Sequence, residues 1–240
     1  MKPRLDRLLV ERGLVPTREK AQALIMAGEV LVDGHKAQKP GQAVDAESRL
    51  EVLAQPPFVG RGGLKLDAAI AHFGIRVAGR ICLDVGASTG GFTDCLLQRG
   101  AARVHAVDVG SGQLDWKIRN DPRVVVHEKL NARYLRREDL GESVDLAVCD
   151  VSFISATLIL PAVAPLLQPG GEMVILVKPQ FEAGKGQVGK GGIVREPELQ
   201  QAACRRVEDA ARQLGFETGI IESPILGAEG NREFLLHAHH

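Results

Sequence analysis

Residues 81–92 read ICLDVGASTGGF, and this stretch decides the fold. The apolar run that ends at Val85 predicts a buried strand, the glycines predict a sharp turn, and a helix is expected to begin near Gly90. Glycines allow a tight turn and let a ligand approach the backbone, so this succession is typical of a cofactor site. The turn residues expected to border a cofactor are Gly86, Ser88, Gly90, Gly91 and Phe92.

A second strand, residues 104–108, ends in Asp108, 22 residues after Gly86. An acid in this place can accept hydrogen bonds from two ribose hydroxyls, as in NAD or S-adenosylmethionine sites. The glycine spacing departs from the GxGxxG pattern of a dinucleotide pyrophosphate. Asp84 would repel a phosphate but suits the amino group of a methionine moiety. The sequence therefore favours S-adenosylmethionine, with Asn131 and Asp150 completing the adenosine pocket.

Beyond this stretch, predicted strands and helices alternate. Strands are expected at 80–85, 103–108, 123–127, 144–149, 172–177, 216–222 and 232–237, and helices at 64–74, 90–99, 112–119, 155–167 and 196–214. The alternation predicts an α/β fold, a Rossmann-like parallel sheet with helices on both faces. A loop without helical periodicity joins the last two strands, so these should form an antiparallel hairpin at the edge of the sheet.

Four charged residues, Lys65, Asp150, Lys178 and Glu233, stand at the edges of segments predicted to be core. Asp150 and Lys178 each follow an apolar run. The carboxyl ends of neighbouring parallel strands form one crevice, where ligands bind. Two lysines and two carboxylates that meet there would suit chemistry on a poorly acidic hydroxyl, so we expect these four residues to be catalytic.

Residues 1–54 predict a separate small α+β unit of two helices followed by a hairpin or small sheet. Residues 1–40 carry eight Lys and Arg against five Asp and Glu, although the whole chain has a net charge of 0. Any affinity for RNA must therefore come from local patches. From charge alone, a solvated helical surface and an RNA-binding surface are equally well supported. The expected RNA contacts in this unit are Arg4, Arg7, Arg18, Lys20 and Lys36.

Two further segments are candidates for RNA contact. Residues 55–63 predict a linker stiffened by prolines, with Arg61 near its end. The glycine-rich stretch from Lys178 to Arg195 contains Lys185 and Lys190 as well. Its place beside a catalytic lysine favours a mobile lid that grips RNA phosphates over a passive connection.

The motifs resemble those of one known family. Residues 1–54 resemble the α-L RNA-binding domain named after a small-subunit ribosomal protein, and the rest resembles the FtsJ-like methyltransferase domain (64–240) of the TlyA family. The latter resemblance is carried by RGGLK (61–65), residues 84–92, CDVSFIS (149–155), KPQFE (178–182) and GNREF (230–234). The resemblance implies a cytoplasmic enzyme that methylates a ribose 2′-oxygen in ribosomal RNA (rRNA). It also implies a cytidine substrate in the large subunit, and in some members the small one.

The resemblance also implies that Lys65, Asp150, Lys178 and Glu233 form a catalytic tetrad. Lys178 is then the candidate base. A free lysine has a pKa of about 10.4, and a neighbouring Lys65 and partial burial both favour its neutral form. Asp150 opposes that effect, so its expected role is to orient Lys178, while Glu233 holds Lys65 or the ribose.

Two other function classes stay open. Some members of the family are labelled haemolysins, so one alternative is a pore-forming haemolysin; the absence of a signal peptide and of an apolar run of roughly 20 residues counts against it. The other is a non-catalytic RNA-binding assembly factor for the ribosome, which would not need a reactive lysine. The four cysteines form no CxxC pair, so no metal site is expected. The sequence fits either a monomer or a dimer.

Overall fold

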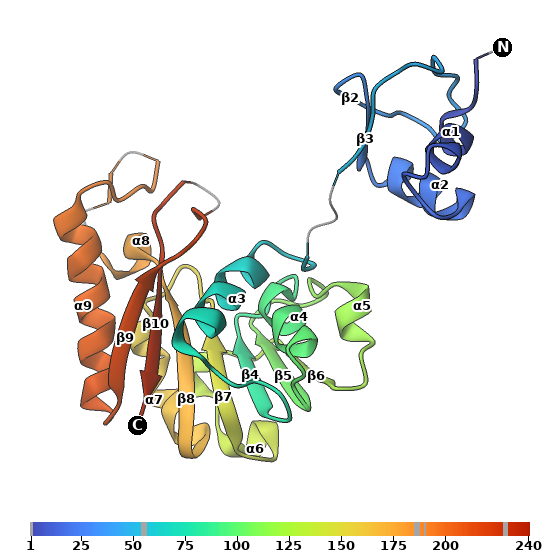
Figure 1. Cartoon of the computed structure of the whole chain (residues 1–240). Helices are drawn as coiled ribbons and strands as arrows, with labels where there is room; N and C mark the ends of the chain where they lie inside the picture. The colour runs from blue at the N-terminus through green and yellow to red at the C-terminus, as the bar shows by residue number, and fades with distance from the viewer. Residues whose placement is uncertain (1, 54–56, 185–187, 190, 228–229) are drawn as a thin grey trace. The chain divides into compact units, whose positions relative to one another are not determined.

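The computed structural model describes residues 2–53, 57–184, 188–189, 191–227 and 230–240. The chain forms two compact units, Met1–Pro56 and Pro57–His240 (Figure 1). The predicted RNA contacts Lys185 and Lys190, and residues 55 and 56 of the predicted linker, lie outside the described residues. No helix in the described part of the chain is both long and apolar enough to cross a membrane.

The N-terminal unit has the elements that its sequence predicts. They are the helices α1 (Leu5–Glu11) and α2 (Arg18–Met26) and an antiparallel sheet of order β2-β1-β3, made of β1 (Val30–Val32), β2 (His35–Lys36) and β3 (Leu50–Val52). Thr17 caps α2, since its hydroxyl accepts a hydrogen bond from Lys20 N. Asp33 and Gly34 both have positive φ, as a tight hairpin turn requires.

The described part of the C-terminal unit contains a seven-stranded sheet of order β6-β5-β4-β7-β8-β10-β9. Its strands are β4 (Ile81–Val85), β5 (Arg103–Asp108), β6 (Val124–Glu128), β7 (Val144–Cys149), β8 (Leu167–Val177), β9 (Glu217–Glu222) and β10 (Phe234–His239). The first five are parallel neighbours, and β10 runs antiparallel to both β8 and β9. The predicted α/β fold and its antiparallel edge hairpin are therefore confirmed.

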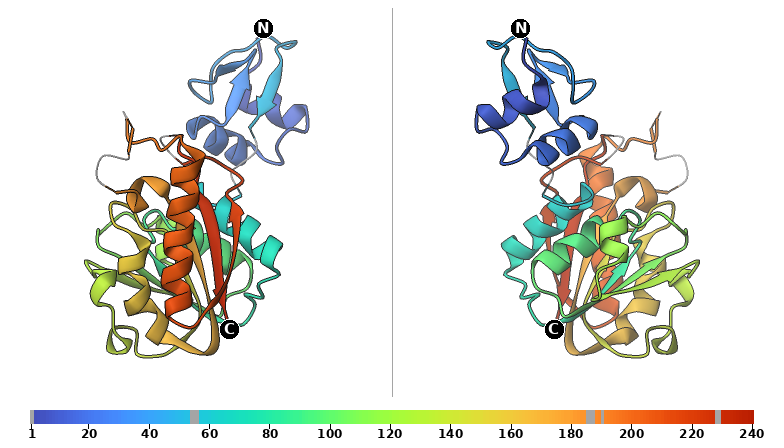
Figure 2. Two further views of the ribbon diagram at one scale, coloured as in Figure 1. Left: turned by 90° about the vertical axis from the view of Figure 1, so that its left-hand side faces the viewer. Right: turned by 90° about the vertical axis from the view of Figure 1, so that its right-hand side faces the viewer.

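Helices cover both faces of this sheet (Figures 1 and 2). The helices are α3 (Gly62–Phe73), α4 (Gly91–Gln98), α5 (Trp116–Arg119), α6 (Arg137–Leu140), α7 (Leu160–Val163), α8 (Pro179–Glu182) and α9 (Pro197–Gln213), with short 3-10 turns η1 (Ala132–Tyr134), η2 (Ala156–Leu158) and η3 (Ala164–Leu166). Apolar residues of α3 and α4 form one core, and those of α7 and α9 form another. Alternate residues of the strands contribute to the two cores, because successive side chains point to opposite faces.

The prediction of a single helix at 155–167 is wrong. This stretch is broken into η2, α7 and η3. It contains Pro161 and Pro165, and a proline inside a helix removes a backbone donor and clashes with the preceding turn. The helix expected at 112–119 is also shorter, because only Trp116–Arg119 is helical.

Candidate active site

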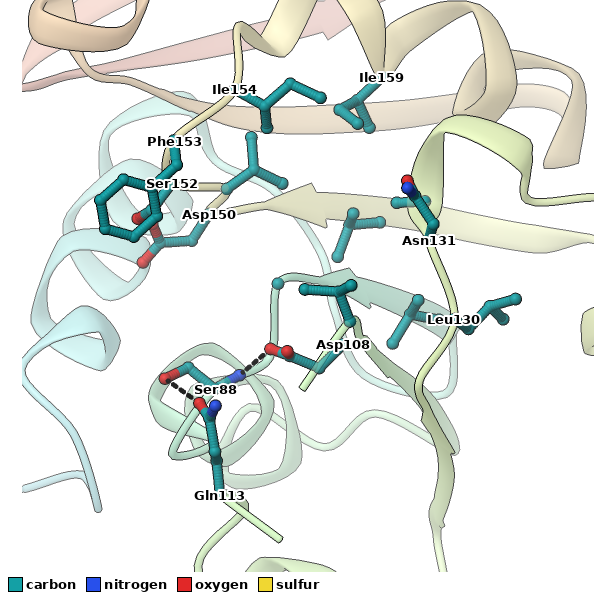
Figure 3. Close-up of a pocket in the computed structure, with 16 residues that line it drawn as sticks. Ser88, Asp108, Gln113, Leu130, Asn131, Asp150, Ser152, Phe153, Ile154 and Ile159 are labelled. Carbon is teal, nitrogen blue, oxygen red and sulfur yellow. Dashed lines mark hydrogen bonds between the residues drawn. The ribbon is translucent and has the colours of Figure 1, made fainter. Parts of the chain in front are cut away.

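A cavity of about 330 Å³ opens at the carboxyl ends of β4, β5, β6 and β7 (Figure 3). This volume lies within the range of small-molecule sites. The loop after each strand contributes to its wall. The lining residues that were predicted to hold a cofactor are Gly86, Ser88, Asp108, Asn131 and Asp150.

Asp108 ends β5 and is fixed at this wall by backbone donors. Its Oδ2 accepts a hydrogen bond from Ser88 N at 2.8 Å (Figure 3), and its Oδ1 accepts one from Gly110 N at 2.7 Å. Ser88 also donates from its hydroxyl to Gln113 Oε1 at 3.4 Å. The carboxylate thus ties the turn after β4 to the loop after β5, and its position does not depend on a long flexible side chain.

Gly86 occupies a point where two loops pass very close to each other. Its φ is +85°, and a Cβ atom there would lie only 2.5 Å from the carbonyl oxygen of Asp150. Asp150 N in turn donates to Val85 O at 2.9 Å. A glycine is therefore required for the loops after β4 and β7 to meet at the cavity.

Four of the residues predicted to border a cofactor do not line this cavity: Asp84, Gly90, Gly91 and Phe92. Gly90 precedes α4 with a φ of +95°, and Phe92 is buried in the core beneath α3. These residues shape the turn and attach it to its surroundings.

Asp84 is completely buried beneath the glycine-rich turn. Thr93 Oγ1 donates to its Oδ2 at 2.6 Å, whereas Oδ1 has no hydrogen-bond partner in the described part of the chain. Burial raises the pKa of Asp84 to about 7. An unpartnered buried carboxylate oxygen is costly, so a cationic ligand group nearby would stabilise it.

The predicted catalytic residues form two ion pairs. Lys178 Nζ lies 2.6 Å from Asp150 Oδ1, and Lys65 Nζ pairs with Glu233 Oε2. The Lys65 and Glu233 side chains are only 9% and 3% exposed, so this second pair is shielded from water.

The sheet register explains how residues so distant in sequence come together. Phe234 of β10 is paired with Val177 of β8, so Glu233 and Lys178 stand at the same end of neighbouring strands. The start of α3 lies beside them, since a Cβ atom at Gly62 would be 3.6 Å from Asp150 Oδ2. Lys65 follows one turn later on α3. All four residues therefore gather at the end of the sheet where β7 and β8 finish.

Several residues at the cavity and at these strand ends were not predicted from the sequence to belong to the site. Phe153 is 93% exposed, has a φ of +65° and lies with its ring centroid 5.3 Å from that of Phe181. Ser152 accepts a hydrogen bond from Lys178 Nζ at 2.8 Å, and Gln113 lies near Asp108. They belong to loops, where no periodicity marks a side chain that faces a cavity. Ser152 and Phe153 stand within the motif CDVSFIS (149–155), but the motif by itself gave neither residue a role.

The residues of the N-terminal unit that were predicted to contact RNA differ in their hydrogen-bond partners within the protein. Arg4 and Arg18 both donate to the buried carboxylate of Asp6 at 2.9 Å, and these guanidinium groups, with Gln22, hold the pKa of Asp6 far below its usual range. Both arginines thus stabilise the N-terminal unit. In the same unit, Arg7, Lys20 and Lys36 are exposed.

Two predicted RNA contacts of the C-terminal unit lie in the described part of the chain. Arg61 is exposed and donates to the carbonyl of Leu226 at 3.0 Å. The side chain of Arg195 is exposed as well. These two cations therefore stay candidates for phosphate contact.

Comparison with known proteins assigns both units. Residues 58–240 match the FtsJ-like methyltransferase family, and residues 3–50 match the S4 domain. The chain is 50% identical over 236 residues to the 16S/23S rRNA (cytidine-2'-O)-methyltransferase TlyA of Mycobacterium tuberculosis, covering 97% of this chain and 88% of that protein. It is 44% identical to Hemolysin A of Brachyspira hyodysenteriae, covering 98% of each. A solved structure from Streptococcus thermophilus, 46% identical, superposes with a TM-score of 0.76 over 99% of this chain and 88% of that one.

Proposed function

Because this chain belongs to the TlyA family of FtsJ-like methyltransferases with an S4 domain, we propose that it transfers a methyl group from S-adenosylmethionine to a ribose 2′-oxygen of rRNA. The observation that carries this proposal is the Lys178–Asp150 ion pair at the edge of the cavity. It joins a proton acceptor to a site large enough for a nucleoside.

The residues around the cavity fit the proposed cofactor. Of the residues that line the cavity, Asp108 would bind the ribose hydroxyls and Asn131 the adenosine. Asp84 is buried beneath the turn and does not line the cavity, so its carboxylate would act on the ammonium of the methionine moiety through its charge and not through contact. Gly86 lines the cavity and lets the loops after β4 and β7 meet there. When bound, S-adenosylmethionine supplies an electrophilic methyl group on a positively charged sulfur.

The chain's own residues would manage the proton of the attacking hydroxyl. Lys178, as a neutral amine, accepts this proton at Nζ, and Asp150 stabilises the ammonium that forms. The buried Lys65–Glu233 pair lies at the same strand ends, where Glu233 holds Lys65 in place. Because the Lys65 and Glu233 side chains are shielded from water, their electrostatic attraction is strengthened.

The proposed substrate is a cytidine of rRNA, in the large subunit and also in the small one, as the name of the M. tuberculosis relative describes for that protein. The exposed ring of Phe153 at the cavity wall suits stacking against an unstacked base. The S4 domain would supply phosphate contacts that position the RNA. Such a substrate places the activity in the cytoplasm, with the ribosomal subunits as partners.

Methyl transfer from radiolabelled S-adenosylmethionine to purified large and small ribosomal subunits tests this proposal, with nuclease mapping of the label. We expect label on single ribose 2′-oxygens. Lys178→Ala should lower the rate by about 10²–10⁴-fold, as for loss of a general base, with unchanged cofactor affinity. Cofactor binding without label on subunits or free rRNA would contradict the proposed substrate, and full activity of Lys178→Ala would contradict the role of the base.

A further inference from the structure

Two oxygen atoms contact the amine of Lys178, one from a carboxylate and one from a hydroxyl. Asp150 Oδ1 lies 2.6 Å from Nζ as an ion-pair partner, at hydrogen-bonding distance. Ser152 Oγ accepts a hydrogen bond from Nζ, at 2.8 Å. Asp150 therefore supplies a charged contact, and Ser152 supplies a second, neutral one.

Direction matters for an amine that acts as a base. A lysine amine rotates about its terminal C–N bond, and its neutral form has two N–H bonds and one lone pair. A single contact, with the carboxylate, holds one N–H bond and leaves two possible directions for the lone pair. When the fixed hydroxyl of Ser152 holds the second N–H bond, only one direction remains for the lone pair, and the amine is ready to accept a proton.

Ser152 itself is held by a constrained loop. Asp150 N is bonded to β4 through Val85 O at 2.9 Å, and Phe153, directly after Ser152, has a φ of +65°. A left-handed conformation is unfavourable for a non-glycine residue and persists only where the surroundings impose it. The backbone on both sides of Ser152 is therefore restrained.

The far end of this loop is attached to the segment that carries Lys178. Glu182, at the end of α8, is only 2% exposed. Its Oε1 accepts a hydrogen bond from Ala156 N at 2.7 Å, and its Oε2 accepts one from Ser155 Oγ. Since α8 begins directly after Lys178, the loop with Ser152 and the segment with Lys178 cannot shift independently.

We propose that Ser152 is a positioning residue that orients the Lys178 amine toward the attacking 2′-hydroxyl. This inference rests on the proposed function, because it assumes that Lys178 is the base. Ser152 also lines the cavity, so a simple contact with the cofactor is the competing role that the experiment has to separate.

The test compares Ser152→Ala with Ser152→Thr, which keeps the hydroxyl, in the full-length protein. Loss of one hydrogen bond to a charged group corresponds to a fall in kcat of about 10- to 100-fold for Ser152→Ala. We expect unchanged affinity for S-adenosylmethionine by calorimetry and recovery of most of kcat in Ser152→Thr. The rising limb of the kcat–pH profile of Ser152→Ala should move to lower pH, because the ammonium form loses an acceptor; the charges next to Lys178, Asp150 and the Lys65–Glu233 pair, are retained.

A second readout does not depend on activity. The rate at which Lys178 is acetylated by a small anhydride, followed by mass spectrometry across pH, should change in Ser152→Ala and return in Ser152→Thr. Unchanged kcat and labelling in Ser152→Ala would overturn the inference. So would a fall in kcat that follows cofactor affinity with an unmoved pH profile. A wild-type protein that methylates no ribose would instead refute the proposed function, while the labelling experiment would still report on Ser152 and Lys178.

Discussion

Two carboxylates of the candidate site, Asp108 and Asp84, differ in their burial and in their hydrogen bonds. Asp108 accepts hydrogen bonds from two backbone N–H groups and borders the cavity. Asp84 is fully buried and has one oxygen without a hydrogen-bond partner among the described residues. Desolvation disfavours the charged form, which is why the pKa of Asp84 rises to about 7.

Replacing Asp84 by Asn should therefore flatten the pH dependence of stability. The folded pKa of about 7 exceeds the ordinary value of 3.8, so the folded protein retains a proton that the unfolded chain releases. The contribution of Asp84 to the free energy of unfolding is full below about pH 4 and is lost as the pH rises through about 7, a difference on the order of 4 kcal/mol. Denaturant unfolding of both proteins between about pH 4 and 8 measures it, and parallel curves would show that Asp84 does not titrate there.

At this scale the sequence predicts charged residues better than neutral ones. Lys65, Asp150, Lys178 and Glu233 stand out because a charge directly beside an apolar run is unusual in a core. Ser152 gives no such sign, because a serine in a loop fits many surroundings. Its contact with Lys178 depends on a loop bend that only the three-dimensional structure shows.

Among the structural elements, the turn after β4 is fixed by steric contact as much as by backbone conformation. Gly86 and Gly74 both have positive φ, but only Gly86 has a neighbour within 4 Å of the position that a Cβ atom would take. A comparison of substitutions at Gly74 and Gly86 therefore distinguishes the cost of backbone strain from the cost of a steric clash.

Gly74→Ala should cost about 1–2 kcal/mol of stability, the cost of a left-handed alanine, and should leave cofactor binding intact. Gly86→Ala adds a clash with the Asp150 carbonyl and should cost more than about 3 kcal/mol. It should also weaken cofactor binding by at least about tenfold, since Asp150 must move. Denaturant unfolding and calorimetry measure the two effects; equal losses in both variants would mean that the close approach is unimportant.

Elements with a long regular pattern are predicted well, and short ones are not. The strands next to the cavity are found because apolar runs of five or six residues are typical of buried parallel strands. The four-residue helix α8 is too short to show a helical period, yet it carries Glu182. Between residues 155 and 167 the apolar pattern suggested one helix, and the prolines decided otherwise.

For the whole molecule, the cations of the N-terminal unit have two separate tasks. Arg4 and Arg18 are bound to the buried Asp6 carboxylate, whereas Lys20 and Lys36 project from the surface. Charge alone did not distinguish these groups in the sequence, because the burial of Asp6 follows from how α1 packs against its neighbours.

Lys20→Glu and Lys36→Glu should weaken binding to ribosomal subunits without changing cofactor affinity. Each lost phosphate contact should reduce the slope of log affinity against log salt concentration by about 1. Arg18→Glu serves as the contrasting variant, because it leaves Asp6 without one of its partners and should also lower the melting temperature of the N-terminal unit. Filter binding over a salt series measures the slope; unchanged slopes in both lysine variants would exclude them from the RNA contact.

The Lys65–Glu233 pair joins residues 168 positions apart, and this fact governs when activity can arise during folding. β10 takes its place between β8 and β9 after both have preceded it along the chain, and Glu233 arrives with it. Contacts between such distant residues form late, because the entropy of closing a long loop must be overcome first. A chain with an unfinished sheet therefore has a paired Lys178 and Asp150 at most, and the onset of methylation during refolding would mark completion of the fold.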